Sequence, residues 1–75
     1  MFTVIGHSQC TYCKQAIQLL ATKGYSFIYK DARQEENKML VEEMKANGLN
    51  TVPQIWLDEE HIGGFVDLQL YLTNI

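Results

Sequence analysis

The sequence predicts an α/β domain with a four-stranded mixed sheet flanked by three helices, in the order βαβαββα. Three observations predict this fold class. An apolar, β-branched run opens the chain and leads through a glycine into an amphipathic helical pattern. A second strand pattern follows that helix, and a strand–helix–strand series is parallel and right-handed in nearly all cases. Two short strand patterns after the only proline, separated by an acidic turn, predict a closing hairpin.

The first half of the chain carries the parallel unit. Residues 2–6 are apolar and β-branched, as in a strand that is buried on both faces. The helix is predicted over residues 11–22, and Gly24 is placed to end it in a left-handed cap. Its apolar positions follow one helix face: Cys13, Ala16, Ile17 and Leu20. Residues 25–29 alternate aromatic and small side chains, which predicts the second strand.

A second amphipathic helix is predicted over residues 34–46, and Asn47-Gly48 is placed to end it. Its apolar residues are expected on one side of the helix: Met39, Leu40, Val41 and Met44. Its glutamates and lysines are expected to form a solvated face.

The last third of the chain predicts a hairpin and a helix. Residues 51–57 predict the third strand, and Pro53 is expected at its beginning or edge because proline cannot donate to a strand ladder. Residues 61–62 predict a short returning strand, and residues 66–72 predict the final helix. With a parallel first pair and a final hairpin, this order is the thioredoxin-like architecture at its minimum size.

Length and composition limit the functional classes. The 75 residues predict one domain, residues 1–75, and 47% hydrophobic with 20% charged residues is ordinary for a globular protein. The net charge of −3 argues against a general nucleic-acid binder, which is expected to have a basic face. The sequence has no apolar run of about 18 residues and no basic leader, so neither a membrane span nor a signal peptide is expected. We therefore expect a cytoplasmic location, where thiols are kept reduced unless they turn over. We also expect a monomer.

Cys10 and Cys13 form a C-x-x-C motif at the predicted start of the first helix. The first amides of a helix have no intrahelical partners, and the aligned peptide dipoles place partial positive charge there. Cysteines in such motifs have pKa values of roughly 3.5 to 7.5, against about 8.5 for a free cysteine, so thiolate is available at neutral pH. Cys10 is therefore the candidate nucleophile. Cys13, nearly one helical turn further on, is expected to point inward and to act as the resolving thiol.

The residues alone leave two other uses of this motif open. His7 extends it to H-x-x-C-x-x-C, which could be half of a zinc site, but structural zinc takes four ligands and the only other histidine is His61. A purely structural disulfide is disfavoured because the loop that it closes is too short for much entropic stabilisation. A C-x-x-C beside a βαβ pattern favours a redox-active pair, and we expect no metal requirement.

The chain as a whole resembles the glutaredoxin family, specifically its small dithiol class. Four segments carry the resemblance, in the family's order: Cys10-Thr11-Tyr12-Cys13, Thr51-Val52-Pro53, Ile62-Gly63-Gly64 and Asp67. A C-x-x-C alone is common, but this combination is highly specific and spans nearly all of the chain. The resemblance implies one glutaredoxin domain, a cis bond before Pro53 and a glutathione-dependent thiol-disulfide oxidoreductase.

The resemblance also implies a site for glutathione as co-substrate. Glutathione has two carboxylates, an amine and a thiol, so its site needs a strand-like backbone edge and partners for the charges. A cis bond at Pro53 would free the Val52 backbone for the glutathione cysteine, and the amides after Gly64 would favour a carboxylate. Asp67 would accept from the γ-glutamyl amine. The implied glutathione contacts are Tyr12, Thr51, Val52, Pro53, Gly64, Phe65, Val66 and Asp67.

Three residues depart from the family pattern. Thr11 stands where many dithiol members carry proline, which restores a backbone N–H and adds a hydroxyl near Cys10. His7 stands where relatives often carry Arg or Lys, so that with His7 neutral the positive field comes from Lys14 and the helix dipole. Val66 stands where Thr or Ser is common, which leaves only a backbone contact to glutathione.

The leading hypothesis is reduction of protein disulfides and protein-glutathione mixed disulfides, with Cys10 as nucleophile and Cys13 as resolving thiol. The implied partners are glutathione and disulfide-containing client proteins, and ribonucleotide reductase is a candidate client because the family often serves it. Two alternatives stay open. One is a thioredoxin-like carrier that a flavoprotein reductase reduces. The other is a dimer around a 2Fe–2S cluster, which some glutaredoxins without the motif proline form and which Thr11 permits.

Overall fold

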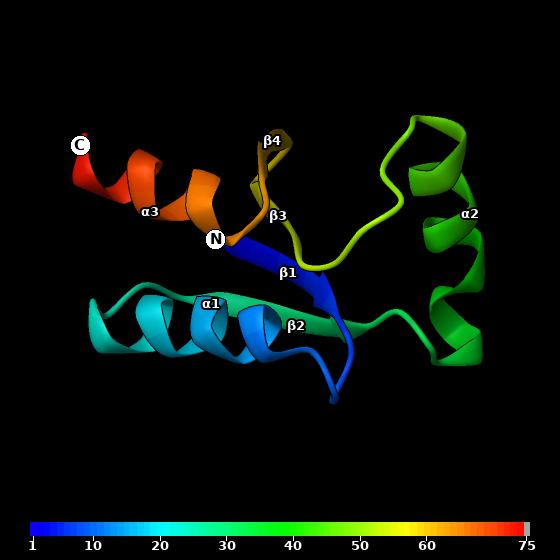
Figure 1. The fold of residues 1–75 in the computed structure, drawn as a ribbon, viewed down its shortest axis with the longest axis horizontal. Helices are drawn as coiled ribbons and strands as arrows, with labels where there is room; N and C mark the ends of the chain where they lie inside the picture. Colours follow the sequence, from blue (N-terminus) through cyan, green and yellow to red (C-terminus); the bar gives the residue numbers. More distant parts are fainter. Residues whose placement is uncertain (75) are drawn as a thin grey trace.

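The computed structural model describes residues 1–74. Over this range the chain follows the expected order βαβαββα, with a short 3-10 helix added before the second helix (Figure 1). The elements are β1 (Phe2–Gly6), α1 (Thr11–Thr22), β2 (Phe27–Asp31), η1 (Glu35–Asn37), α2 (Lys38–Ala46), β3 (Gln54–Leu57), β4 (Glu60–Gly63) and α3 (Phe65–Thr73). The predicted fold class is confirmed. In this part of the chain, each helix is too short or too polar to cross a bilayer.

The strands form one mixed sheet in the order β2-β1-β3-β4. β1 pairs in parallel with β2, across the α1 connection, and antiparallel with β3. β3 and β4 form the closing hairpin, whose register shifts between Ile55 and Trp56. The central place of β1, with a neighbour on each side, accounts for its nearly continuous apolar run.

Helices α1 and α3 pack against each other on one face of the sheet (Figure 1). Alternation along β1 directs Phe2 and Val4 to this face, and both are almost completely buried. The buried core cluster consists of Phe2, Val4, Ala16, Leu20, Ile55, Leu68 and Leu72. Burying one such large aliphatic side chain stabilises the fold by about 1.5–3 kcal/mol. This core fixes the axis of α1 and therefore the position of the cysteines at its N-terminus.

Helix α2 runs across the direction of α1 and α3, at one end of the domain (Figure 1). Met44 is 5% exposed and anchors the helix, whereas Met39 is 82% exposed. The prediction that Met39 shares the apolar side is therefore wrong. At about 100° per residue, the five positions between Met39 and Met44 separate them by about 140° around the helix.

Two strands begin later than predicted. β2 begins at Phe27 because the Tyr25 N–H is already engaged, donating to the Leu20 carbonyl of α1 at 3.0 Å. β3 begins at Gln54, directly after Pro53, because proline has no N–H to give to the ladder. The expectation that Pro53 stands at the beginning of the strand is confirmed.

The last residue of β1 must be glycine because Cys13 packs directly onto it. A Cβ at Gly6 would overlap the Cys13 sulfur and lie 2.9 Å from the Cys13 Cβ. We expect Gly6→Ala to lower the free energy of unfolding by about 1–3 kcal/mol, as overpacking of a core does. Urea unfolding of the reduced protein measures this loss.

Gly64→Ala is the matched control for this prediction. A Cβ at Gly64 would meet its nearest atom, the Pro53 carbonyl oxygen, only at 3.7 Å, and the backbone there has φ −91°. This variant should keep the stability of the native protein or gain a few tenths of a kcal/mol, since alanine restricts the unfolded chain. Equal stability of the two variants would contradict the role given to the contact between Gly6 and Cys13.

Candidate active site

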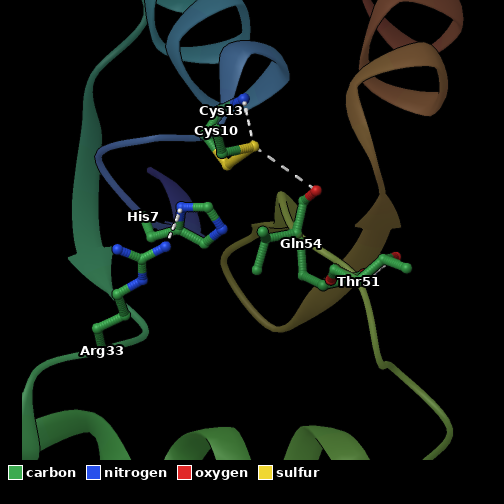
Figure 2. Close-up of a disulfide and its surroundings, with 7 residues drawn as sticks. His7, Cys10, Cys13, Arg33, Thr51 and Gln54 are labelled. Carbon is green, nitrogen blue, oxygen red and sulfur yellow. Dashed lines mark hydrogen bonds between the residues drawn. A yellow bond between two sulfur atoms is a disulfide. The ribbon is translucent and has the colours of Figure 1, made fainter.

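Cys10 and Cys13 form a disulfide at the N-terminus of α1 (Figure 2). Cys10 is the N-cap residue, with an extended backbone (φ −93°, ψ 112°), and Cys13 lies in the first turn. Cys13 is 1% exposed, whereas Cys10 is partly exposed. The two sulfurs therefore differ in access, and Cys10 carries the one that an incoming disulfide or thiol can reach.

The backbone around Cys10 favours negative charge on its sulfur. The Cys13 N–H, which has no partner within the helix, donates to the Cys10 sulfur at 3.1 Å. No acidic residue lies in the first turn of α1, and Lys14 follows Cys13. After reduction, this N–H and the helix dipole both stabilise the thiolate of Cys10 relative to the thiol.

The phenol of Tyr29, beside the end of β1, adds no negative charge at neutral pH. Partial burial, and then the neighbouring Asp31 carboxylate, raise the pKa of Tyr29 above its usual value, against a smaller opposing effect of Arg33. Tyr29 therefore stays protonated over the pH range in which a cysteine thiol ionises.

The loop before β3 brings backbone polar groups to the Cys10 sulfur. The Val52–Pro53 peptide bond is cis, which confirms what the resemblance implied. The Val52 carbonyl oxygen lies 3.7 Å from the Cys10 sulfur (Figure 2). A disulfide sulfur has no proton to donate, so in the oxidised protein this is a contact without a hydrogen bond. The Val52 backbone therefore borders the accessible sulfur of the pair.

The start of α3 forms the far wall of the site. The Asp67 carboxylate accepts from the Gly64 N–H at 2.9 Å, through its Oδ2 atom. The Asp67 side chain is exposed, and its second carboxylate oxygen makes no hydrogen bond within residues 1–74. The rings of Tyr12 and Phe65 lie 5.9 Å apart and join the start of α1 to the start of α3. The first turns of two helices therefore border the same space.

A groove of about 290 Å³ lies between these segments. It is lined by Tyr12, Thr51, Val52, Pro53, Gly64, Phe65, Val66 and Asp67. These are the eight residues that the sequence analysis assigned to glutathione, and the structure brings all of them together. A larger cavity of about 390 Å³ lies between α2 and the hairpin, beside Trp56 and His61. The smaller groove is the one beside the redox pair, because its wall includes Tyr12 of the C-x-x-C motif and Val52, whose carbonyl oxygen lies near the Cys10 sulfur.

His7 does not meet the other candidate zinc ligand. The ring of His61 stacks on Trp56, with centroids 4.9 Å apart, and its Nε2 pairs with the Gln54 side chain at 2.8 Å. Over residues 1–74, no three His, Cys, Asp or Glu side chains come together in a way that could hold a metal ion. His7 instead lies 3.4 Å from the guanidinium of Arg33 (Figure 2).

Sequence reasoning left two contributors out of the assigned site. Gly63 has φ 124°, and a Cβ there would lie 2.7 Å from the carboxylate carbon of Asp67. Gly63 thus leaves the space in which the Asp67 side chain folds back onto the Gly64 N–H. In the sequence, the Gly63-Gly64 pair was the feature that indicated this close approach. Arg33 reaches the active-site loop from a segment 26 positions after His7. The local sequence around Arg33 or His7 cannot indicate a contact between residues so far apart in the chain.

Fold and site together define a class of protein. A thioredoxin-like sheet, a disulfide at a helix N-terminus with one accessible sulfur, and a cis proline beside it are the parts of a dithiol-disulfide oxidoreductase.

Comparison with known proteins identifies the family. The family model described as Glutaredoxin matches residues 1–62. Glutaredoxin 3 of Escherichia coli (strain K12) is 47% identical over 60 residues, which cover 79% of this chain and 70% of that protein. The glutaredoxin of Pseudomonas aeruginosa is 44% identical over 61 residues, which cover 79% of this chain and 69% of that protein.

Solved structures agree over the whole fold. Reduced Escherichia coli glutaredoxin matches with a TM-score of 0.77 and 29% identity, covering 97% of this chain and 93% of that one. A buckwheat glutaredoxin-glutathione complex matches with a TM-score of 0.82, covering 97% of this chain and 68% of that one, and at 21% identity it supports the fold alone. The chain belongs to the glutaredoxin family. It is a dithiol glutaredoxin, a glutathione-dependent disulfide reductase.

Asp67 caps the first turn of α3. Two substitutions of Asp67 should separate the contribution of its hydrogen bond to stability from the contribution of its charge. Asp67→Ala removes both, and we expect a loss of about 0.5–2 kcal/mol in the free energy of unfolding. Asp67→Asn keeps an oxygen for the Gly64 N–H and loses only the interaction of the charge with the helix dipole, about 0.3–1 kcal/mol. Urea unfolding of both variants measures the difference, and equal losses would mean that the hydrogen bond adds nothing.

Proposed function

We propose that Cys10 is the nucleophile and Cys13 the resolving thiol in the reduction of protein disulfides and of protein-glutathione mixed disulfides. The observation that carries the proposal is the difference between the two sulfurs. Cys10 is partly exposed and accepts the Cys13 N–H at 3.1 Å, whereas Cys13 is 1% exposed beneath it. Only the outer sulfur has both access and a stabilised thiolate.

The proposed reaction with a protein disulfide has four steps. The Cys10 thiolate attacks one client sulfur, so that a Cys10-client disulfide forms and the second client sulfur leaves as a thiolate. The Cys13 thiolate then attacks the Cys10 sulfur and releases the reduced client, leaving the Cys10-Cys13 disulfide. One glutathione thiolate opens this disulfide at Cys10 and frees Cys13. A second attacks the bound glutathione sulfur, giving glutathione disulfide and the reduced protein.

The groove supports this scheme because its polar groups match those of glutathione. The Val52 backbone beside the Cys10 sulfur suits the backbone of the glutathione cysteine, a one-residue case of strand addition. The open oxygen of Asp67 suits the γ-glutamyl amine, and the first amides of α3 suit the neighbouring carboxylate. The rings of Tyr12 and Phe65 form an apolar wall. A volume of about 290 Å³ is close to the lower end of ordinary ligand sites, roughly 300 Å³.

We further propose that the protein acts as a cytoplasmic monomer without a metal requirement. Its clients are disulfide-containing proteins, with ribonucleotide reductase as one candidate. The 2Fe–2S dimer and the carrier served by a flavoprotein reductase remain alternatives. Brown colour in anaerobically purified protein would favour the dimer, and brisk reduction by thioredoxin reductase would favour the carrier.

Single-cysteine variants test the two roles. We expect Cys10→Ser to abolish glutathione-dependent reduction of a small glutathione mixed disulfide, because no nucleophile remains. Cys13→Ser should keep that activity, because this reaction needs Cys10 alone, and should lose the reduction of a protein disulfide. Turnover is measured through coupling to glutathione reductase.

Turnover by Cys10→Ser at the native rate would contradict the assignment of the nucleophile. Absence of turnover by the native protein, beside rapid reduction by thioredoxin reductase, would contradict glutathione as the electron donor. Cys13→Ser with full activity on a protein disulfide would contradict its role as the resolving thiol.

A further inference from the structure

Gln54 is the only buried amide, hydroxyl or charged side chain among residues 1–74, at 6% exposed. It is the first residue of β3 and follows the cis bond at Pro53 directly. Its backbone is fixed, because it pairs with Ile5 of the central strand β1. The proposed reaction gives this side chain no part. Since a buried amide is unfavourable unless its polar atoms are engaged, the partners of Gln54 indicate its role.

Both ends of the Gln54 amide are engaged. Its Nε2 donates to the Thr51 carbonyl oxygen at 3.0 Å and lies 3.4 Å from the Thr51 hydroxyl (Figure 2). Its Oε1 lies 2.8 Å from His61 Nε2. A carbonyl can only accept, so the NH₂ group must face Thr51 and the amide oxygen must face His61. His61 Nε2 therefore carries a proton and donates it to Gln54.

The amide of Gln54 ties the loop before β3 to the sheet. Within residues 1–74, neither Thr51 nor Val52 makes a hydrogen bond between backbone groups. The Val52 carbonyl contacts the Cys10 sulfur, but neither a disulfide sulfur nor a thiolate has a proton to donate to it. The bond from Gln54 to the Thr51 carbonyl is therefore the tie that holds in both redox states.

The position of this loop matters for one kind of thiol. The backbone of the glutathione cysteine is proposed to pair with Val52, and such hydrogen bonds need heavy atoms about 2.7–3.2 Å apart in good alignment. Thr51 and Val52 both line the groove. A small thiol without peptide groups has nothing to pair with Val52. A displaced loop therefore weakens the reaction with glutathione and leaves the reaction with a small thiol as it is.

His61 fixes which way round the Gln54 amide lies. With the amide turned over, its oxygen would face the Thr51 carbonyl and its NH₂ group would face the donor of His61, so both contacts would be repulsive. His61 is itself held by the stacking of its ring on Trp56, its partner across the β3–β4 hairpin.

We propose that Gln54, oriented by His61, is a positioning residue that holds the Thr51-Val52 segment in place for glutathione. The pair thereby sets the preference of the enzyme for glutathione over small thiols. This inference rests on the proposed function, since it places glutathione against Val52. The loss of one well-placed hydrogen bond changes a rate constant by about five-fold.

The test follows the opening of the Cys10-Cys13 disulfide by two thiols, glutathione and 2-mercaptoethanol, each in excess over the oxidised protein. One thiolate attacks the Cys10 sulfur, which forms a mixed disulfide and frees Cys13 as a thiolate. A second attacks the bound sulfur, giving the disulfide of the added thiol and the reduced protein. Acid quenching, alkylation and mass spectrometry give the rate of disulfide loss. We expect the native protein to react faster with glutathione.

Gln54→Leu keeps the size of the side chain and removes its hydrogen bonds. It should slow the reaction with glutathione about five-fold and leave the rate with 2-mercaptoethanol unchanged. His61→Phe keeps a ring against Trp56 without the N–H, and should lower the preference in the same way. His61→Gln, which supplies an N–H at a similar reach, should restore the preference.

Gln18→Leu is the matched control, because it makes the same change on the exposed face of α1 and should keep the native preference. The ratio of the two rates separates positioning from stability. A variant with a merely loosened fold exposes its disulfide to both thiols alike, so its two rates change together.

Two results would overturn the inference while leaving the proposed function intact. One is an unchanged preference in Gln54→Leu, which would mean that the loop keeps its position without the amide. The other is an equal change with both thiols, which would mean that Gln54 acts on the fold or on Cys10 and not on glutathione. If the native protein reacted no faster with glutathione than with 2-mercaptoethanol, the proposed glutathione site itself would fail, and this inference with it.

Discussion

The active site depends on how closely α1 approaches the end of β1. Cys13 is 1% exposed, and the space its side chain occupies lies where a Cβ at Gly6 would be. The helix can settle this deeply only because β1 ends in a residue without a side chain. The depth decides which sulfur is buried and which lies at the surface. The difference in roles between Cys10 and Cys13 thus follows from packing as much as from their order in the motif.

Backbone N–H and C=O groups provide much of the electrostatic environment of the Cys10 sulfur and the Asp67 carboxylate. The Cys13 N–H faces the Cys10 sulfur, the Val52 carbonyl lies beside it, and the Gly64 N–H holds the Asp67 carboxylate. Backbone dipoles are fixed by the fold, so they need no reorganisation when charge develops on sulfur. Their positions depend on the course of the backbone more than on side-chain identity.

The fold could be predicted from the sequence where local periodicity matches the tertiary environment. The strand at residues 2–6 and the helix at residues 11–22 have the predicted bounds, since their apolar residues face one core. The predicted strand start and the predicted apolar helix side were wrong at two residues, where tertiary contacts determine the structure. Tyr25 lies outside β2 and donates its N–H to the Leu20 carbonyl of α1, and Met39 lies well away from the side of α2 that carries Met44.

The groove residues could be predicted only through the resemblance. They come from three segments, and no local pattern places the starts of two helices and a proline loop in one space. Even the resemblance did not point to Arg33. Its contact with His7 joins positions 26 residues apart, in a loop whose sequence looks like an ordinary solvated stretch. Gly63 was visible as part of a glycine pair, but only the structure reveals that Asp67 fills the space above it.

Helices α1 and α3 both begin beside the same groove. The contact between the rings of Tyr12, in α1, and Phe65, in α3, brings the two helix starts together. Each helix start carries about half a positive charge, and Asp67 offsets that of α3, so the positive potential of the groove lies at the start of α1, on a chain whose net charge is −3. A negatively charged tripeptide is therefore repelled by the molecule at long range and attracted over the last few ångströms. Because salt screens the long-range part first, moderate ionic strength should speed the encounter rather than slow it. The crowded ionic medium of a cell would then favour this small acidic protein as a partner for an anionic thiol.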